Sequence, residues 1–219
     1  FEFTPRDHRG WGPATAWSLR NADGDSVTLT IATENPIHAN NPHYVTLQGG
    51  DCLTNEGFDG IPVKKGEKYF VSLFGRAVKG GANRAIVQLI DPQGNIIGKA
   101  DLKFGKKGWK KAETTLTASQ SCKDATLRVS VPEGATADLD MISLMPEKTF
   151  KGRRNGLRED LAQTLADLNP KFVRFPGGCV AHGDGIDNIY DWKGSIGPLE
   201  ARKPLSNLWG YHQTRGLGY

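Results

Sequence analysis

The feature that most constrains this chain is the alternation of apolar and polar residues between Trp17 and Met145. It recurs in six segments: SVTLTIA (26–32), YVTLQ (44–48), KYFVSLFGRA (68–77), RAIVQLID (84–91), WKKAETTLTA (109–118) and ATLRVSVP (125–132). Turn sequences such as NADGD, KKGE, DPQGN and PEGA separate them. Because successive strand side chains point to opposite faces, the pattern predicts half-buried β-strands. Such regular spacing without helical periodicity predicts an antiparallel sandwich or jelly roll.

The pattern changes after Pro146. The segment NGLREDLAQTLADLNP (155–170) places four leucines on one helical face and predicts a helix with Asn155 as its N-cap. The next segment, KFVRF (171–175), is apolar enough to predict a buried parallel strand, and a Gly-rich loop follows it. Helix, strand and loop form half of a βα repeat. A single parallel strand needs neighbours, so we expect the chain to be a fragment of a larger α/β protein.

Composition excludes several classes of protein. Of the 219 residues, 37% are hydrophobic and 24% are charged, which is typical of a soluble globular protein. The formal net charge of +4 is too small to predict nucleic-acid binding, and no apolar run reaches the roughly 20 residues of a membrane span. The densest basic segment, KFGKKGWKK (103–111), fits either a solvated hairpin with edge-protecting lysines or a surface for an anionic partner.

Cysteine usage and the first residue bear on the compartment. Cys52, Cys122 and Cys179 are odd in number and show no metal-ligand spacing, which argues against a disulfide scaffold. The sequence begins with Phe1 rather than Met, so a signal region could precede it. Secretion therefore stays open, and we favour a secreted or periplasmic location.

Three segments in the second half resemble those of a known family. The run NGLREDLAQTLADLNPKFVRFPGGCV, followed by DWKGSIGPLEAR and NLWGY, resembles the α-L-arabinofuranosidases of glycoside hydrolase family 51 over roughly residues 140–219. Residues 1–145 look like the carbohydrate-binding-module-like jelly roll of some members. The resemblance implies a mainly β chain, with an antiparallel jelly-roll sandwich over residues 1–146. Residues 147–219 would be the opening helix, strand and loop of a truncated (β/α)₈ barrel.

The same resemblance implies an activity for the parent protein. It would be a retaining enzyme that hydrolyses terminal α-L-arabinofuranosyl residues of arabinan or arabinoxylan without a catalytic cofactor. Retaining chemistry needs two carboxylates ~5 Å apart, and the resemblance places both glutamates outside this chain, with the rest of the barrel. Glu147, Glu159 and Glu200 are not expected to be catalytic. We therefore expect the isolated chain to be inactive.

The resemblance also points to substrate-binding residues. Arg174 would lie beneath the sugar and pair with the nucleophile; the alternative is an arginine paired with a local carboxylate at a sheet end. The Gly177–Gly178 pair lets the backbone approach a ligand, and Cys179 follows it. Asn207 and Trp209 lie in the long loop after the strand. Tryptophan faces stack on sugars, so Trp209 is either an aromatic wall of the site or a residue that anchors the loop.

Two further expectations concern the sandwich. Its aromatic residues either fill the core or form sugar platforms; they are Trp11, Trp17, Tyr44, Tyr69 and Trp109. Glu2 and Asp140, near the two predicted terminal strands, could share a structural calcium, since Ca²⁺ prefers oxygen ligands. Besides the enzyme fragment, two alternatives stay open: a stand-alone carbohydrate-binding protein and a purely architectural β-domain.

Overall fold

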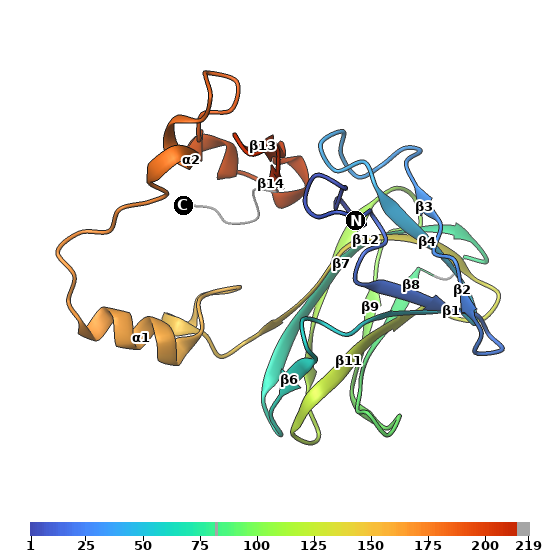
Figure 1. Ribbon diagram of the computed structural model, residues 1–219. Coiled ribbons are helices and arrows are strands. Elements are labelled where there is room, and N and C mark those ends of the chain that lie inside the picture. Colours follow the sequence, from blue (N-terminus) through green and yellow to red (C-terminus); the bar gives the residue numbers. More distant parts are fainter. Residues whose placement is uncertain (82, 214–219) are drawn as a thin grey trace. The chain divides into compact units, whose positions relative to one another are not determined.

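The computed structural model describes residues 1–81 and 83–213 (Figure 1). The chain divides into two compact units. The first unit comprises Phe1–Thr15, Ile31–Tyr44 and Pro170–Tyr219, and the second comprises Ala16–Thr30 and Val45–Asn169. The assignment of residues 1–146 to a sandwich and of residues 147–219 to a barrel segment stays a prediction.

The second unit contains two antiparallel sheets. One has the strand order β2-β1-β5-β11-β8-β9, with β6 paired to β11, and the other contains β10-β7-β12-β4 in that order. The strands are β1 (Trp17–Arg20), β2 (Ser26–Val27), β4 (Tyr44–Gln48), β5 (Cys52–Asn55), β6 (Ile61–Val63), β7 (Lys68–Lys79), β8 (Arg84–Ile90), β9 (Ile96–Lys103), β10 (Lys110–Thr117), β11 (Cys122–Ser130) and β12 (Thr136–Pro146). The predicted antiparallel sandwich is therefore confirmed.

The core lies between the two sheets. Strand β7, which runs beside β12 over most of its length (Figure 1), buries every second residue: Tyr69, Val71 and Leu73. The facing sheet contributes Leu53, Val87, Leu89 and Val129, all fully buried. The inner faces meet so closely that a Cβ atom on Gly98 would lie 2.6 Å from the Leu116 Cδ2. A side chain at this point of contact between β9 and β10 would force Leu116 to shift, which glycine avoids.

The remaining elements are short. In the second unit, the 3₁₀ turn η1 (Phe150–Gly152) and the helix α1 (Glu159–Asp167) follow the sandwich. The first unit contains β3 (Ile31–Ala32), α2 (Gly178–His182), η2 (Trp192–Ser195), η3 (Leu199–Ala201), β13 (Leu205–Ser206) and β14 (His212–Gln213). Within residues 1–81 and 83–213, no helix combines the length and hydropathy that crossing a membrane requires.

The predicted helix forms, but it starts later than expected. Its N-cap is Arg158, whereas Asn155 has a left-handed φ of 50°, so the prediction of Asn155 as the cap is wrong. Glu159 and Asp160 occupy the first turn, where negative charge is favoured by the helix dipole. Arg158 binds Asp160 at 2.7 Å across the same turn. The predicted apolar face exists but is exposed: Leu157 66%, Leu161 58%, Leu165 62% and Leu168 73%.

The predicted strand over residues 171–175 does not form. These five residues are exposed and belong to no strand among the described residues. A strand needs a partner for its N–H and C=O groups, and the described chain supplies none here. The prediction of a buried strand is thus wrong for this chain, whereas the expectation that the segment would lack barrel neighbours is confirmed.

A buried carboxylate organises the turn between β8 and β9. Asp91 is 7% exposed and accepts hydrogen bonds from Gln93 N (3.0 Å), Asn95 N (2.8 Å), Asn95 Nδ2 (2.9 Å) and Gln120 Nε2 (2.9 Å). These bonds favour the ionised form, so they lower the pKa of Asp91 below its ordinary value, with the Asn95 side chain as the largest cause. Burial opposes this effect.

The core packing predicts opposite results for two Leu→Ala variants. Leu116 is fully buried, so Leu116→Ala should lower the free energy of unfolding by about 3 kcal/mol through lost burial and a cavity. Leu165 is 62% exposed, so Leu165→Ala should change it by less than about 0.5 kcal/mol. Urea unfolding followed by circular dichroism measures both. Equal losses would contradict the described core.

The Asp91 turn predicts a pH-dependent loss of stability. Because the pKa of Asp91 is lower in the folded state, its contribution is present above the unfolded pKa and is lost as the pH falls through the folded value. The difference in unfolding free energy between the native chain and Asp91→Asn should be largest at neutral pH and shrink between about pH 5 and pH 2. Asp101→Asn, at an exposed position of β9, controls for the lost charge. A difference in unfolding free energy that grows as the pH falls would contradict the lowered pKa of Asp91.

Candidate functional site

The predicted substrate loop begins with Arg174 and two glycines. Arg174 is exposed, and its guanidinium lies close to Gly177, where a Cβ atom would stand 3.2 Å from the Arg174 Nε. Gly177 also has a φ of 77°, which L-residues rarely adopt. The positive φ favours glycine at this position, whereas the exposed Arg174 side chain could move aside for a Cβ atom. The backbone then enters α2, with Gly178 as its first residue and the exposed free thiol of Cys179 as its second.

The predicted residue Asn207 has a structural role in the hairpin of β13 and β14. It is 6% exposed, and its Oδ1 accepts hydrogen bonds from Trp209 N (3.0 Å) and Tyr211 N (3.0 Å). The amide oxygen is therefore engaged in holding the turn. Trp209 lies in that turn and is 56% exposed, so its indole is accessible. No interaction found in residues 1–81 and 83–213 joins Arg174 to Asn207 or Trp209.

Three glutamates follow the sandwich, and each lies in a local setting of its own. Glu147 is exposed directly after β12, and Glu200 is in η3. Glu159 begins α1 and pairs with Lys148 at 3.1 Å, which raises the pKa of that lysine. None of the three lies at the end of a barrel strand, where barrel enzymes place their catalytic groups.

The two residues expected to share calcium lie in different units. In the first unit, Glu2 accepts hydrogen bonds from His43 N (2.9 Å) and His43 Nδ1 (2.7 Å). In the second, Asp140 is fully buried and accepts from Met141 N (2.7 Å) at a bulge in β12. Of the residues that the structure describes, no three of the types His, Cys, Asp and Glu gather as a metal centre would require. Calcium shared by Glu2 and Asp140 stays a prediction.

The sandwich aromatics divide into core and surface residues. Tyr69 and Tyr44 are buried, and their hydroxyls are bonded to Lys64 N (2.9 Å) and Glu34 O (2.7 Å). These two are core residues, not sugar platforms. Trp109 is half-buried under the Arg76 guanidinium, 4.7 Å from the ring centroid. Trp11 is 38% exposed and packs on Phe3, whereas Trp17 is half-buried beside a surface hollow.

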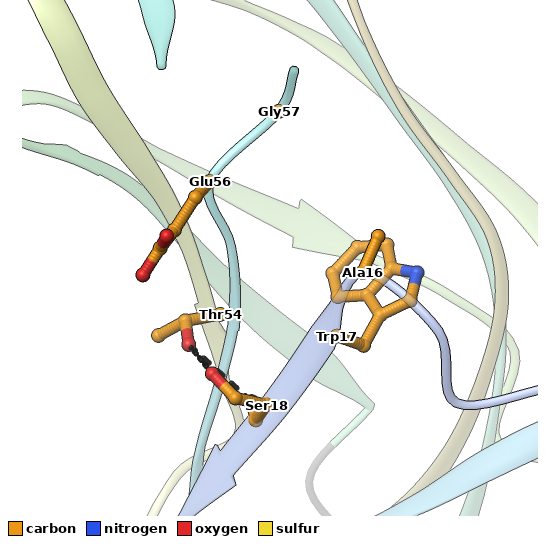
Figure 2. A pocket seen from close by; sticks show the side chains of 6 residues that line it. All are labelled: Ala16, Trp17, Ser18, Thr54, Glu56 and Gly57. Carbon is orange, nitrogen blue, oxygen red and sulfur yellow. Dashed lines mark hydrogen bonds between the residues drawn. The ribbon is translucent and has the colours of Figure 1, made fainter. Parts of the chain in front are cut away.

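That hollow lies at the ends of β1 and β5 and holds about 280 Å³. It is lined by Ala16, Trp17, Ser18, Thr54, Glu56 and Gly57 (Figure 2). The Ser18 and Thr54 hydroxyls are 2.6 Å apart. Figure 2 shows the Glu56 carboxylate on the same side of the chain as the Thr54 hydroxyl, with the Trp17 indole at the other end of the hollow.

The sequence alone gave no sign of this hollow beyond Trp17. Ser18 and Thr54 are 36 residues apart, and only the antiparallel register of β1 and β5 sets them directly opposite each other. Glu56 is the first residue after β5, and its carboxylate lies on the same side of the chain as the Thr54 hydroxyl (Figure 2). A register between distant strands has no local sequence signal, so the three polar residues could not be grouped in advance.

Comparisons with known proteins agree with the motifs. Residues 164–219 match the family model described as "Alpha-L-arabinofuranosidase 1 domain". The whole chain is 35% identical to the extracellular exo-α-L-arabinofuranosidase of Streptomyces chartreusis, of which it covers 27%. It is 34% identical to α-L-arabinofuranosidase 1 of Arabidopsis thaliana over 78% of this chain and 25% of that protein. The chain thus spans about a quarter of the length of these relatives.

A solved structure shows the same relationship. The arabinose-bound α-L-arabinofuranosidase MgGH51 matches 94% of this chain and 35% of its own, with a TM-score of 0.79 and 29% identity. Sequence motifs, family model and fold therefore all place this chain as similar to a segment of the α-L-arabinofuranosidases of glycoside hydrolase family 51.

Proposed function

We propose that this chain is part of a retaining α-L-arabinofuranosidase that removes terminal α-L-arabinofuranosyl residues from arabinan or arabinoxylan. The observation that supports it most is the 35% identity to the Streptomyces chartreusis enzyme along the entire chain. The matched region spans the Arg-Phe-Pro-Gly-Gly loop, in which Gly177 has a φ of 77° that favours glycine.

In this proposal the chain supplies the substrate side of the site and not its catalytic carboxylates. Arg174 is an exposed cation, and a carboxylate nucleophile brought next to it would be held ionised. Gly178 and Cys179 would approach the sugar through their backbone, and Trp209 would cover it with its accessible indole. Asn207 would act by shaping the turn that carries Trp209. The two glutamates of the retaining mechanism would come from the rest of the barrel.

Replacing the matching segment of the Streptomyces chartreusis enzyme with this chain tests the proposal. The chimera should hydrolyse p-nitrophenyl α-L-arabinofuranoside, whereas the 219-residue chain alone should not, since it lacks the carboxylate pair. In the chimera, Arg174→Ala should lower kcat/KM by about 100-fold through lost electrostatic stabilisation. Lys171→Ala, an exposed charge in the same segment, should leave it unchanged. Turnover by the pure chain would refute the proposal that the two catalytic glutamates lie outside this chain.

The hollow on the sandwich supports a second candidate function, saccharide binding by the β-domain. Thr54 Oγ1 also lies 3.3 Å from the Ser18 carbonyl oxygen and donates to it. The Ser18 hydroxyl then donates to Thr54 Oγ1 and keeps its own lone pairs for a ligand. With the Glu56 carboxylate, the hollow offers hydrogen-bond acceptors beside an indole, which suits the O–H donors and apolar faces of a sugar.

Glu56→Gln tests this second function. It should weaken binding of linear arabino-oligosaccharides to the full chain by about fivefold, because a charge-assisted acceptor is lost. Glu147→Gln makes the same chemical change at an exposed position outside the hollow and should have no effect. Isothermal titration calorimetry measures both affinities. No binding by the native chain, or equal effects of the two variants, would leave the sandwich an architectural domain.

A further inference from the structure

One end of the sandwich carries a concentration of positive charge that the proposed functions do not use. Six exposed cations form it, and we call them the basic end: Lys79, Arg84, Lys103, Lys106, Lys107 and Lys110. They come from the end of β7, the start of β8, the end of β9, the following loop and the start of β10. The basic segment noted in the sequence supplies four of them, and the fold adds Lys79 and Arg84.

Backbone contacts hold these segments together. Phe104 N donates to Asn83 O (2.9 Å), and Asn83 Nδ2 donates to Phe104 O (2.6 Å). Ala77 N donates to Gly105 O (3.3 Å), which ties the end of β7 to the same loop. A Cβ atom on Gly105 would lie 3.2 Å from the Lys110 Cβ, so the start of β10 is adjacent as well. The cations are therefore clustered by a fixed backbone arrangement.

The positive charge of the basic end is not compensated. Arg84 lies directly opposite Lys103 in the β8–β9 register, and like charges in that position repel. In the part of the chain described, none of the six cations forms an ion pair. The neighbouring Lys111 does form one, with Glu113 at 2.6 Å. Acidic neighbours are few, with Asp101 two residues before Lys103 and Glu133 in the turn that meets Gly80.

Protection of sheet edges explains only part of this arrangement. Lysines on edge strands prevent unwanted pairing, which accounts for Lys103 on β9 and Lys110 on β10. It does not account for Lys106 and Lys107, which lie in the loop, or for Arg84, whose strand β8 is flanked by β11 and β9. A repulsive, solvated cluster beyond the edge strands is suited to attracting an anionic ligand.

We propose that the basic end binds an acidic polysaccharide through the carboxylates of its uronosyl units. Five of the six cations are lysines, and their ammonium groups attract anions as flexible point charges, without the fixed bidentate geometry of arginine, which suits carboxylates spaced along a flexible polymer. The choice of a polysaccharide rests on the proposed function, in which the parent enzyme acts on polymeric substrate. Such binding would hold the chain near acidic polymers while the neutral arabinofuranosyl groups are processed elsewhere.

The chain contains a matched control for this proposal. The Lys-Lys-Gly sequence of the basic end, Lys106–Gly108, recurs as Lys64–Gly66 in the turn between β6 and β7. Both lysine pairs are exposed, so the two double variants, Lys106→Ala with Lys107→Ala and Lys64→Ala with Lys65→Ala, remove equal charge. Circular dichroism melting of both should match the native chain, since neither change touches the core.

Binding of the full chain to polygalacturonate and to its methyl ester tests the proposal. The native chain should bind the acid polymer at about 20 mM NaCl, lose binding at about 500 mM NaCl, and not bind the ester. The variant at Lys106 and Lys107 should bind about fivefold more weakly, and the variant at Lys64 and Lys65 should match the native chain. Equal binding of the ester, equal losses in both variants, or tighter binding of duplex DNA would each overturn the proposal. Because no hydrolysis is measured, failure here is distinct from failure of the chimera.

Discussion

The packing of β7 against the opposite sheet is the contact on which the rest of the sandwich depends. Strand β7 joins β10 and β12 and buries Tyr69, Val71 and Leu73 on its inner face. A Cβ atom on Gly75, further along the same face, would lie 2.6 Å from the Phe104 ring, so the two sheets meet here without space for a side chain. The backbone N–H of Phe104 in turn donates a hydrogen bond to Asn83 O, and this bond positions the loops of the basic end. Core packing and surface charge are therefore linked through one strand.

The segments that follow the sandwich expose apolar side chains instead of burying them. Helix α1 exposes its leucine face, and the nearby sequence exposes Phe172 (83%) and Val173 (82%). Exposed apolar residues of this kind, in each unit taken by itself, suit a surface that contacts a partner. Within the proposed function, the rest of the barrel would be that partner, and residues 171–175 would pair with its strands. The helix forms because its hydrogen bonds are local, whereas a strand depends on neighbours.

The residues of the candidate site differ in how well the sequence predicted their contacts. Arg174 and Gly177 are three positions apart, and the short loop brings the Arg174 side chain next to Gly177. Asn207 was predicted as a ligand-binding residue from its motif, but its Oδ1 is engaged by two backbone amides of its own turn. A motif shows that a residue is important, but it does not show what its side chain contacts. Whether Asn207 also reaches substrate stays a prediction.

The sequence by itself determined the two-sheet architecture, the helix after it and the family resemblance, because alternation, helical periodicity and short motifs are all local signals. It did not determine the Arg84–Lys103 opposition, the Ser18–Thr54 pair or the Glu2–His43 contact. These depend on strand register and on loop closure between residues that are 19 to 41 positions apart. Only the tertiary structure decides such contacts, because the packing of the whole core selects one register over the others.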